Sequence, residues 1–233
     1  MKRLVKAVLV GWAAVLLVCG GIDSLFALGT GRQPESSTPQ KPVQSVSAAE
    51  ATPAGGASLS GKAALSGKAP AAEKIQMAAD PVCVQQHKQD AFKQEVVSKN
   101  GTLQYVLVYI KEGAQENHPV PAQPVTLNQV GCVYEPHVFG IQVGQKLEVL
   151  NSDPTLHNIN CQPKANKKFN IAQPVKGMKT TKTFDKPEIG VSFKCNVHPW
   201  MAAYGGVFSH PFYAVTDGQG AFSIKGLSAG TYT

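Results

Sequence analysis

Short apolar runs separated by turn residues fill the chain from residue 57 onward, and this pattern predicts β-strands. Gln104–Ile110 (QYVLVYI) is rich in β-branched and aromatic residues and follows a turn signal, KNG, so it predicts one buried strand. Two more strands are predicted around Gly144, within Phe139–Asp153. A first strand with its turn is predicted at Leu59–Ala69, and a further pair of strands at Gly190–Cys195 and Tyr204–Ser209.

One short helix is predicted after Asp80. The carboxylate of Asp80 can accept hydrogen bonds at a helix N-terminus, and Pro81 suits the first helical position because an N–H there would have no partner. Many short strands with one small helix are typical of two β-sheets packed face to face. We therefore expect an all-β sandwich with one short helix.

The first residues have the arrangement of an export signal. Lys2, Arg3 and Lys6 precede the apolar run Ala7–Ile22, and small residues further on permit cleavage before Thr30. The run is short for a full membrane span and long for the apolar part of a signal, so an uncleaved anchor remains open. Residues 1–29 are therefore expected to be a signal peptide or an N-terminal membrane anchor. Either one places the body of the protein in the periplasm or outside the cell.

Residues 30–56 are expected to form a flexible linker. From Gly31 to Gly56 there is no Leu, Ile, Met or aromatic residue, and four prolines interrupt a background of Ser, Gln and Ala. Such a segment cannot bury enough apolar surface to offset the entropy lost on ordering. The body of the protein is then residues 57–212, followed by a separate C-terminal pattern at 213–233.

Composition and charge narrow the classes of partner. Charged residues make up 16% of the chain, and Gly (22) and Pro (16) are frequent, which argues against a coiled coil or a helical bundle. The net charge is +7, and Lys164–Lys194 carries eight cations and two anions. This stretch is either a solvated basic loop or a patch that attracts an acidic redox protein. Nucleic-acid binding is excluded by the compartment and by the lack of an aromatic platform beside the lysines.

A group of metal-binding residue types occurs in the segment KCNVHPWM. In it Cys195, His198 and Met201 follow one another at intervals of three residues, and Pro199 stiffens the loop. Thiolate, imidazole and thioether are donors that Cu(I) prefers and Cu(II) accepts. A second imidazole would complete a known electron-transfer site, and His157, which follows an apolar strand, is placed to supply it from a neighbouring strand end.

These residues resemble the cupredoxins, the plastocyanin-like blue copper proteins. The resemblance rests on N-x-D-x-x-x-H-N ending at Asn158 and on C-x-x-H-P-x-M, and the short ligand loop is most similar to amicyanin. It covers about residues 134–209 and implies a Greek-key sandwich that binds one mononuclear Cu(I)/Cu(II) ion. It implies that His157, Cys195, His198 and Met201 are the ligands. It also implies that Asn158 ties the two ligand loops together by hydrogen bonds.

The remaining cysteines allow more than one arrangement. In an oxidising compartment four cysteines suggest two disulfides by default. Cys195 belongs to the copper motif, and Cys83 and Cys132 flank a region that a minimal cupredoxin does not need. We therefore expect one disulfide between Cys83 and Cys132, with two buried free thiols as the alternative. Cys161 would then be a thiol near the metal, an intermolecular partner or simply buried. The other histidines are not expected to be ligands, because none has a second donor at metal-binding spacing: His87, His118, His137 and His210.

The C-terminal segment Tyr213–Thr233 carries a second resemblance. Its pattern V-T-D-x-x-G-x-F-x-I, followed by G-x-Y, resembles the beginning of a carboxypeptidase-regulatory-like (transthyretin-like) β-sandwich. The segment holds too few strands to be stable alone. We therefore expect a C-terminally truncated domain.

Together the residues and the resemblance predict an exported copper protein that carries single electrons between redox partners and touches membrane only through its N-terminus. One alternative is a copper-holding or delivery module without redox turnover. Another is a structural or adhesive β-sandwich protein. An enzyme is not expected, because the sequence shows no second metal motif and no acid/base pair for a substrate.

Overall fold

The computed structural model describes residues 56–87, 89–114 and 118–233. The predicted signal peptide or anchor (1–29) and nearly all of the predicted linker (30–56) lie outside these residues. In the described ranges, no helix combines the length and the apolar character needed to cross a bilayer. These residues form strands joined by loops and a single helix, α1 (Pro81–Gln86).

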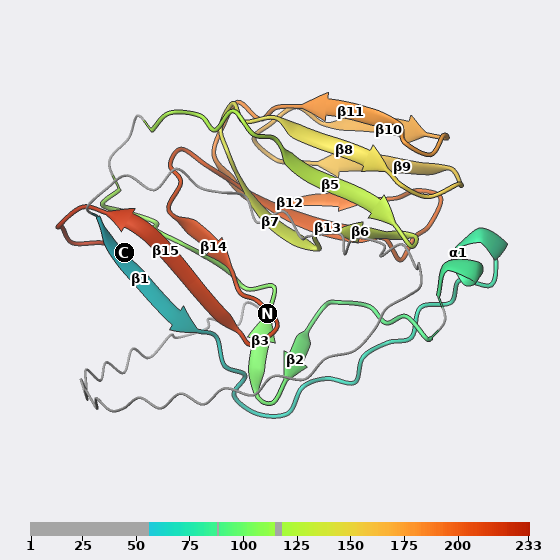
Figure 1. The fold of residues 1–233 in the computed structure, drawn as a ribbon, viewed down its shortest axis with the longest axis horizontal. Coiled ribbons are helices and arrows are strands. Elements are labelled where there is room, and N and C mark those ends of the chain that lie inside the picture. Colours follow the sequence, from blue (N-terminus) through green and yellow to red (C-terminus); the bar gives the residue numbers. More distant parts are fainter. Residues whose placement is uncertain (1–55, 88, 115–117) are drawn as a thin grey trace, which may run out of the picture. The chain divides into compact units, whose positions relative to one another are not determined.

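Two sheets form the central sandwich, and the larger one has five strands in the order β10-β9-β12-β13-β7 (Figure 1). The strands of this sheet are β7 (Val138–Gln142), β9 (His157–Gln162), β10 (Phe169–Gln173), β12 (Glu188–Lys194) and β13 (Ala202–Phe208). Neighbouring strands are antiparallel except β13 and β7, which are parallel.

The second sheet has four strands in the order β11-β8-β5-β6. They are β5 (Val125–Val130), β6 (Val133–Glu135), β8 (Leu147–Asn151) and β11 (Lys179–Lys182). The chain passes back and forth between the sheets, since β7, β9 and β10 belong to the larger sheet and β8 and β11 to the smaller one. This is the connectivity expected of a Greek-key sandwich. The predicted all-β sandwich with one short helix is confirmed for the described residues.

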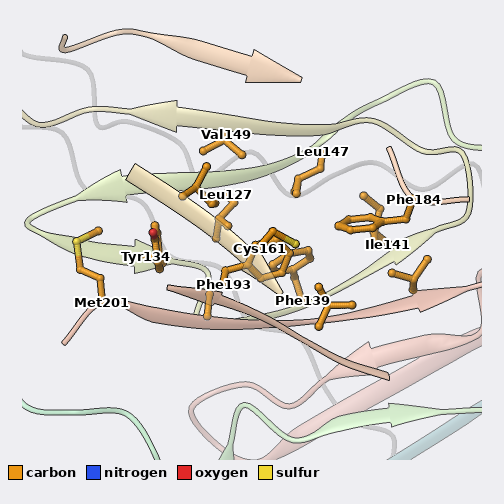
Figure 2. Close-up of a cluster of buried hydrophobic side chains, with 14 of the residues drawn as sticks. Leu127, Tyr134, Phe139, Ile141, Leu147, Val149, Cys161, Phe184, Phe193 and Met201 are labelled. Carbon is orange, nitrogen blue, oxygen red and sulfur yellow. The ribbon is translucent and has the colours of Figure 1, made fainter. Parts of the chain in front are cut away.

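The core lies between the two sheets. Side chains from both, including Leu127, Ile141, Val149 and Phe193, are almost completely buried in one cluster (Figure 2). Phe193 packs against Phe139 with 5.4 Å between ring centroids. Burial of this kind contributes about 25 cal/mol for each Å² of apolar surface removed from water, so this cluster stabilises the packing of the two sheets.

Outside the sandwich, the described residues form three small two-stranded sheets. They pair β1 (Ala57–Lys62) with β15 (Ala221–Leu227), β4 (Leu107–Tyr109) with β14 (Tyr213–Val215), and β2 (Val97–Lys99) with β3 (Thr102–Gln104). A second apolar cluster, with Ile110, Phe212, Ile224 and Leu227 at its centre, packs beside them. The segment Tyr213–Thr233 therefore shares two sheets with residues that precede the sandwich.

Five of the six strands predicted above are present, as β1, β7, β8, β12 and β13, and one is not. Gln104–Ile110 is wrong as a single buried strand, because β3 ends at Gln104 and β4 begins at Leu107. Tyr105 between them has a φ of 64°. The left-handed backbone of Tyr105 interrupts the extended conformation at this position, and the residues of β4 are only half-buried.

The helix α1 begins as predicted and is attached to the sandwich by a covalent bond. Asp80 accepts hydrogen bonds from the backbone N–H groups of Val82 (2.8 Å) and Cys83 (3.4 Å). Cys83 is disulfide-bonded to Cys132, in the turn between β5 and β6. Both cysteines are completely buried, in a small cluster against which Trp200 packs.

The disulfide should contribute more to stability than any single buried thiol. Replacing both Cys83 and Cys132 by Ala should lower the free energy of unfolding by about 4 kcal/mol, because it frees a loop of roughly 50 residues in the unfolded chain. Urea denaturation of the metal-free full chain measures this loss. Cys161→Ala, which removes one buried sulfur, is the control, with an expected loss of about 1 kcal/mol. A double variant as stable as this control would contradict the prediction.

Candidate metal centre

Three neighbouring strands bring the predicted ligands to one end of the larger sheet. His157 is the first residue of β9, Cys195 directly follows β12, and Met201 directly precedes β13. Because β12 is antiparallel to both neighbours, its end lies beside the beginning of β9 and of β13. His198 lies in the loop between β12 and β13, and Figure 2 shows Met201 at one end of the core cluster.

Three donor atoms converge at this position. The Nδ1 atoms of His157 and His198 are 2.9 Å apart, and the Sγ of Cys195 is 3.8 Å from the Nδ1 of His198. The three residues are almost completely buried, with 0%, 3% and 2% of their surface exposed for His157, Cys195 and His198. Two imidazole nitrogens and one thiolate sulfur, shielded from water, form a donor set that copper or zinc can use. The residues present therefore fit a metal ion.

Backbone hydrogen bonds hold the ligand loop in a compact turn. Cys195 N–H donates to the carbonyl of Met201 (3.3 Å), and Met201 N–H donates to the carbonyl of His198 (2.9 Å). The backbone N–H of His198 also donates to the Sγ of Cys195 at 3.3 Å. The loop is thus closed on itself, and Met201, 1% exposed, is buried beside the other three residues.

The protein favours the thiolate form of Cys195. Burial by itself raises the pKa of this thiol. Hydrogen bonds from His157 and from the backbone N–H groups of Asn158, His198 and Val197 outweigh burial and lower the pKa to about 6. The thiolate is the form that binds metals, so the site is prepared for a cation at neutral pH.

His157 compensates the charge of the thiolate when no metal is present. Burial lowers its pKa, but the hydrogen bond to Asp153 and the neighbouring Cys195 raise it to about 9. Its imidazole is then protonated at neutral pH. A metal ion that binds at Nδ1 has to displace this proton, so binding releases a proton from the site.

Asp153 binds the Nε2 of His157, the ring nitrogen that faces away from the site. Its carboxylate accepts a hydrogen bond from the Nε2 of His157 at 2.9 Å and from the backbone N–H groups of Gly131 and Cys132 at 2.8 Å each. Burial raises the pKa of Asp153, but these hydrogen bonds bring it below its ordinary value. The carboxylate stays charged and holds a proton on Nε2 of His157, so the proton that a metal ion displaces is the one on Nδ1, which is directed at the site.

Asp153 is in turn fixed by a polar network within the sandwich. Asn151 accepts a hydrogen bond from the backbone N–H of Asp153 (2.9 Å) and donates to the carbonyls of Thr155 (3.0 Å) and Gln173 (2.8 Å). The side chain of Gln173 is bonded to that of Gln129. All four of Gln129, Asn151, Asp153 and Gln173 are completely buried. Buried polar groups with partners restrict a loop to one conformation, so the turn before His157 is rigid.

The outer ring nitrogen of His198 also contacts a carboxylate, that of Asp80. The Oδ2 of Asp80 accepts a hydrogen bond from the Nε2 of His198 at 2.9 Å. This bond is the main reason that the pKa of Asp80 lies below its ordinary value, with burial acting in the opposite direction. Asp80 precedes α1 and lies 118 residues before His198 in the sequence. Both imidazoles therefore present Nδ1 to the site and Nε2 to a carboxylate.

Asn158 links the strand that carries His157 to the ligand loop. Its Oδ1 accepts a hydrogen bond from the backbone N–H of Asn196 at 2.5 Å, and its Nδ2 donates to the Oδ1 of Asn170 at 2.5 Å. Asn196 directly follows Cys195. The contact fixes the distance between the two parts of the chain that supply donor atoms.

Trp200 covers another side of His198. The two rings lie 5.1 Å apart between centroids, and the Trp200 Nε1–H donates to the carbonyl of Cys132 at 2.9 Å. Beside them opens a cleft of about 520 Å³, whose walls include Asp80, Lys93, Val197 and His198. Because His198 lines this cleft, solvent comes close to one of the residues that supply the donor atoms.

Among the described residues, the other free cysteine and the remaining histidines lie outside this group of donors. Cys161 is a buried thiol on β9 whose pKa is raised to about 12 by burial. His137 bonds to the carbonyl of Ala202 (2.9 Å) and packs edge-on against Tyr105. His87 bonds to the carbonyl of Gly131 at 2.6 Å, while His118 and His210 pack against Phe212.

Sequence reasoning missed both carboxylates. Asp153 lies inside the motif N-x-D-x-x-x-H-N, four residues before His157, so its position was visible although no role was assigned to it. Asp80 was predicted only as a helix cap. Its second contact, with His198, joins residues so distant in sequence that no local pattern signals it.

Comparisons with known proteins give partial likenesses. No protein-family model and no curated protein matches the sequence. The copper-containing nitrite reductase NirK from Thermus scotoductus SA-01 is 25% identical at a TM-score of 0.35, over 43% of this chain and 25% of the reductase. A purple cupredoxin from Nitrosopumilus maritimus is 22% identical at a TM-score of 0.31, over 36% of this chain and 98% of its own. An amicyanin variant in the Cu(I) form is 18% identical at a TM-score of 0.33, over 38% and 85% of the two chains. The chain thus spans a quarter of the length of the nitrite reductase.

The hydrogen bond from the backbone of Asn196 to Asn158 should contribute more to stability than the exposed hydrogen bond between the side chains of Asn160 and Asn196. Asn158→Ala should destabilise the metal-free protein by about 1–3 kcal/mol, because it leaves a part-buried N–H without an acceptor. Asn160→Ala, two residues along β9, removes an exposed side-chain contact with Asn196 and should change stability by less than about 0.5 kcal/mol. Chemical denaturation of both variants measures the difference. Equal losses would contradict the prediction.

Proposed function

We propose that this chain is an exported, cupredoxin-type protein that binds one copper ion and carries single electrons between redox partners. His157, Cys195 and His198 would be the strong ligands and Met201 the axial ligand. When bound, copper would supply a one-electron couple between Cu(I) and Cu(II). The observation that carries the proposal is the convergence of two Nδ1 atoms and one sulfur at a buried end of the sandwich.

The residues around the donor atoms suit this role because they are already in place. Both imidazoles are fixed from behind by Asp80 and Asp153, and the loop that holds Cys195 and His198 is closed by backbone bonds. Donors that do not move when the charge of the ion changes keep the cost of reorganisation small. The sandwich also keeps bulk water away from the sulfur.

An electron carrier is favoured over a delivery module and over an enzyme. A delivery module has to release its metal, and four buried residues held by hydrogen bonds favour retention instead. The other groupings of possible metal ligands among the described residues each require a sulfur of the Cys83–Cys132 disulfide. They offer no second metal for an enzyme, and we propose that the protein is not one.

The location and partners belong to the same proposal. The arrangement of Lys2, Arg3, Lys6 and the apolar run after them supports export to the periplasm or beyond, with or without an N-terminal tether. The lysines of residues 164–194 support an acidic redox protein as partner. The pattern of residues 213–233 supports a carboxypeptidase-regulatory-like segment after the copper domain.

Absorption and EPR spectra of the copper-loaded full chain test the proposal. We expect an intense thiolate-to-copper band that is absent from Cys195→Ser, because only this variant removes the sulfur donor. Cys161→Ser, which changes the other free thiol of the described residues, is the matched control and should keep the band. A wild-type chain without the band, or a band that survives in Cys195→Ser, would overturn the assignment. Rapid loss of copper to a chelator would favour the delivery module instead.

Small charged oxidants test the role of the basic segment. Ferricyanide should oxidise the reduced copper-loaded chain about tenfold faster at low salt than at about 0.15 M salt, because the lysines attract the anion. Tris(phenanthroline)cobalt(III), a cation, should show no such acceleration. Replacing the exposed Lys167 and Lys168 by Gln should weaken the salt dependence with ferricyanide, whereas Lys62→Gln, on β1, should not. Identical salt dependence in all variants would rule out steering by this segment.

A further inference from the structure

Asp80 reaches the proposed copper site from a part of the chain that the cupredoxin resemblance does not cover. Its Oδ2 accepts hydrogen bonds from the Nε2 of His198 (2.9 Å) and from the hydroxyl of Thr155 (3.1 Å). Its Oδ1 accepts from the backbone N–H groups of Val82 and Cys83. Both oxygens are therefore engaged, so the carboxylate has one orientation, with Oδ2 directed at the imidazole.

The disulfide connects Asp80 to the carboxylate on the other histidine. Cys83 lies three residues after Asp80, and its partner Cys132 donates its backbone N–H to Asp153 at 2.8 Å. The carbonyl of Cys132 accepts from Trp200, which packs on His198. One covalent bond thus joins the segments that hold the outer nitrogens of both imidazoles. Such a connection is not needed to cap a helix of six residues.

A carboxylate in this position has a definite effect on an imidazole ligand. By accepting the Nε2 proton it fixes the tautomer, leaves Nδ1 free to bind, and makes the ring a stronger donor. Its negative charge stabilises Cu(II) more than Cu(I), because the attraction grows with the charge of the ion. The contact is largely shielded, since the side chains of His198 and Asp80 are 2% and 20% exposed.

We propose that Asp80 is a positioning residue of the metal centre, which fixes His198 for metal binding and lowers the reduction potential of the bound copper. Asp153 acts in the same way on His157. The inference rests on the proposed function, because it assigns Asp80 an effect on the copper ion. It assigns the segment before the sandwich a role in tuning the site, in addition to its role in the fold.

Two substitutions separate this role from helix capping. Asp80→Asn keeps a good N-cap and nearly the same shape but removes the charge. Asp80→Ser also keeps a good N-cap and is too short to reach His198. Asp185→Asn, an exposed carboxylate before β12 and at the other end of that strand from Cys195, removes the same charge and is the matched control.

The test measures Cu(II) and Cu(I) affinities and the reduction potential of the full chain. In both Asp80 variants the Cu(II) affinity should fall by about 10- to 100-fold and the Cu(I) affinity by less. For each factor of ten by which the Cu(II) affinity falls more than the Cu(I) affinity, the reduction potential should rise by about 59 mV. Asp185→Asn should change neither affinity by more than about twofold. Asp80 variants that behave like Asp185→Asn would overturn the inference.

The outcome also distinguishes this inference from the proposed function. A wild-type chain with the thiolate-to-copper band and Asp80 variants identical to the control would overturn only the role of Asp80. If the band is absent, Zn(II) affinity serves as the readout, and a selective loss in the Asp80 variants still supports positioning of His198. Equal Zn(II) affinities would overturn it. A wild-type chain that binds neither metal would overturn both proposals.

Discussion

The carboxylates behind the two histidines are the constraint on which the candidate site depends. Without a partner at its outer nitrogen, each imidazole ring could rotate and turn its Nδ1 away from the site. Asp153 and Asp80 prevent this, because each holds one ring by Nε2 and turns Nδ1 inwards. Each carboxylate is itself fixed, Asp153 by backbone N–H groups and Asp80 by the start of α1. The hydrogen bonds of Asp153 and Asp80 therefore set both the orientation of the two imidazole rings and the charge beside them.

The sandwich brings the proposed ligands together by placing the ends of their strands side by side. Antiparallel pairing of β12 with β9 and β13 brings residues from positions 157, 195 and 201 to one end of one sheet. The apolar core below that end removes water, and this makes each hydrogen bond at the site count for more. The buried glutamine and asparagine side chains that hold Asp153 also connect β10 of the larger sheet to β5 and β8 of the smaller one, so the same contacts support the fold and the site.

Local sequence predicted those features that depend on short spacing. The ligand loop is visible in C-x-x-H-P-x-M, and α1 is visible in Asp80-Pro81, because caps and turns are decided within a few residues. The strand break at Tyr105 was missed, since an apolar run does not reveal a left-handed residue within it. The contact of Asp80 with His198 was missed because it is formed only when the chain has folded back on itself. Tertiary contacts between distant residues leave no periodic signal.

The pairing of β1 with β15 has a kinetic consequence. Ala57 lies opposite Leu227, so the first strand of the described chain has its partner near the end of the described residues. During synthesis on the ribosome, β1 emerges well before β15, its hydrogen-bonding partner in this sheet. Closing so long a loop is slow compared with forming a hairpin. The central sandwich can assemble earlier, and β15 then closes the outer layer as a late step of maturation.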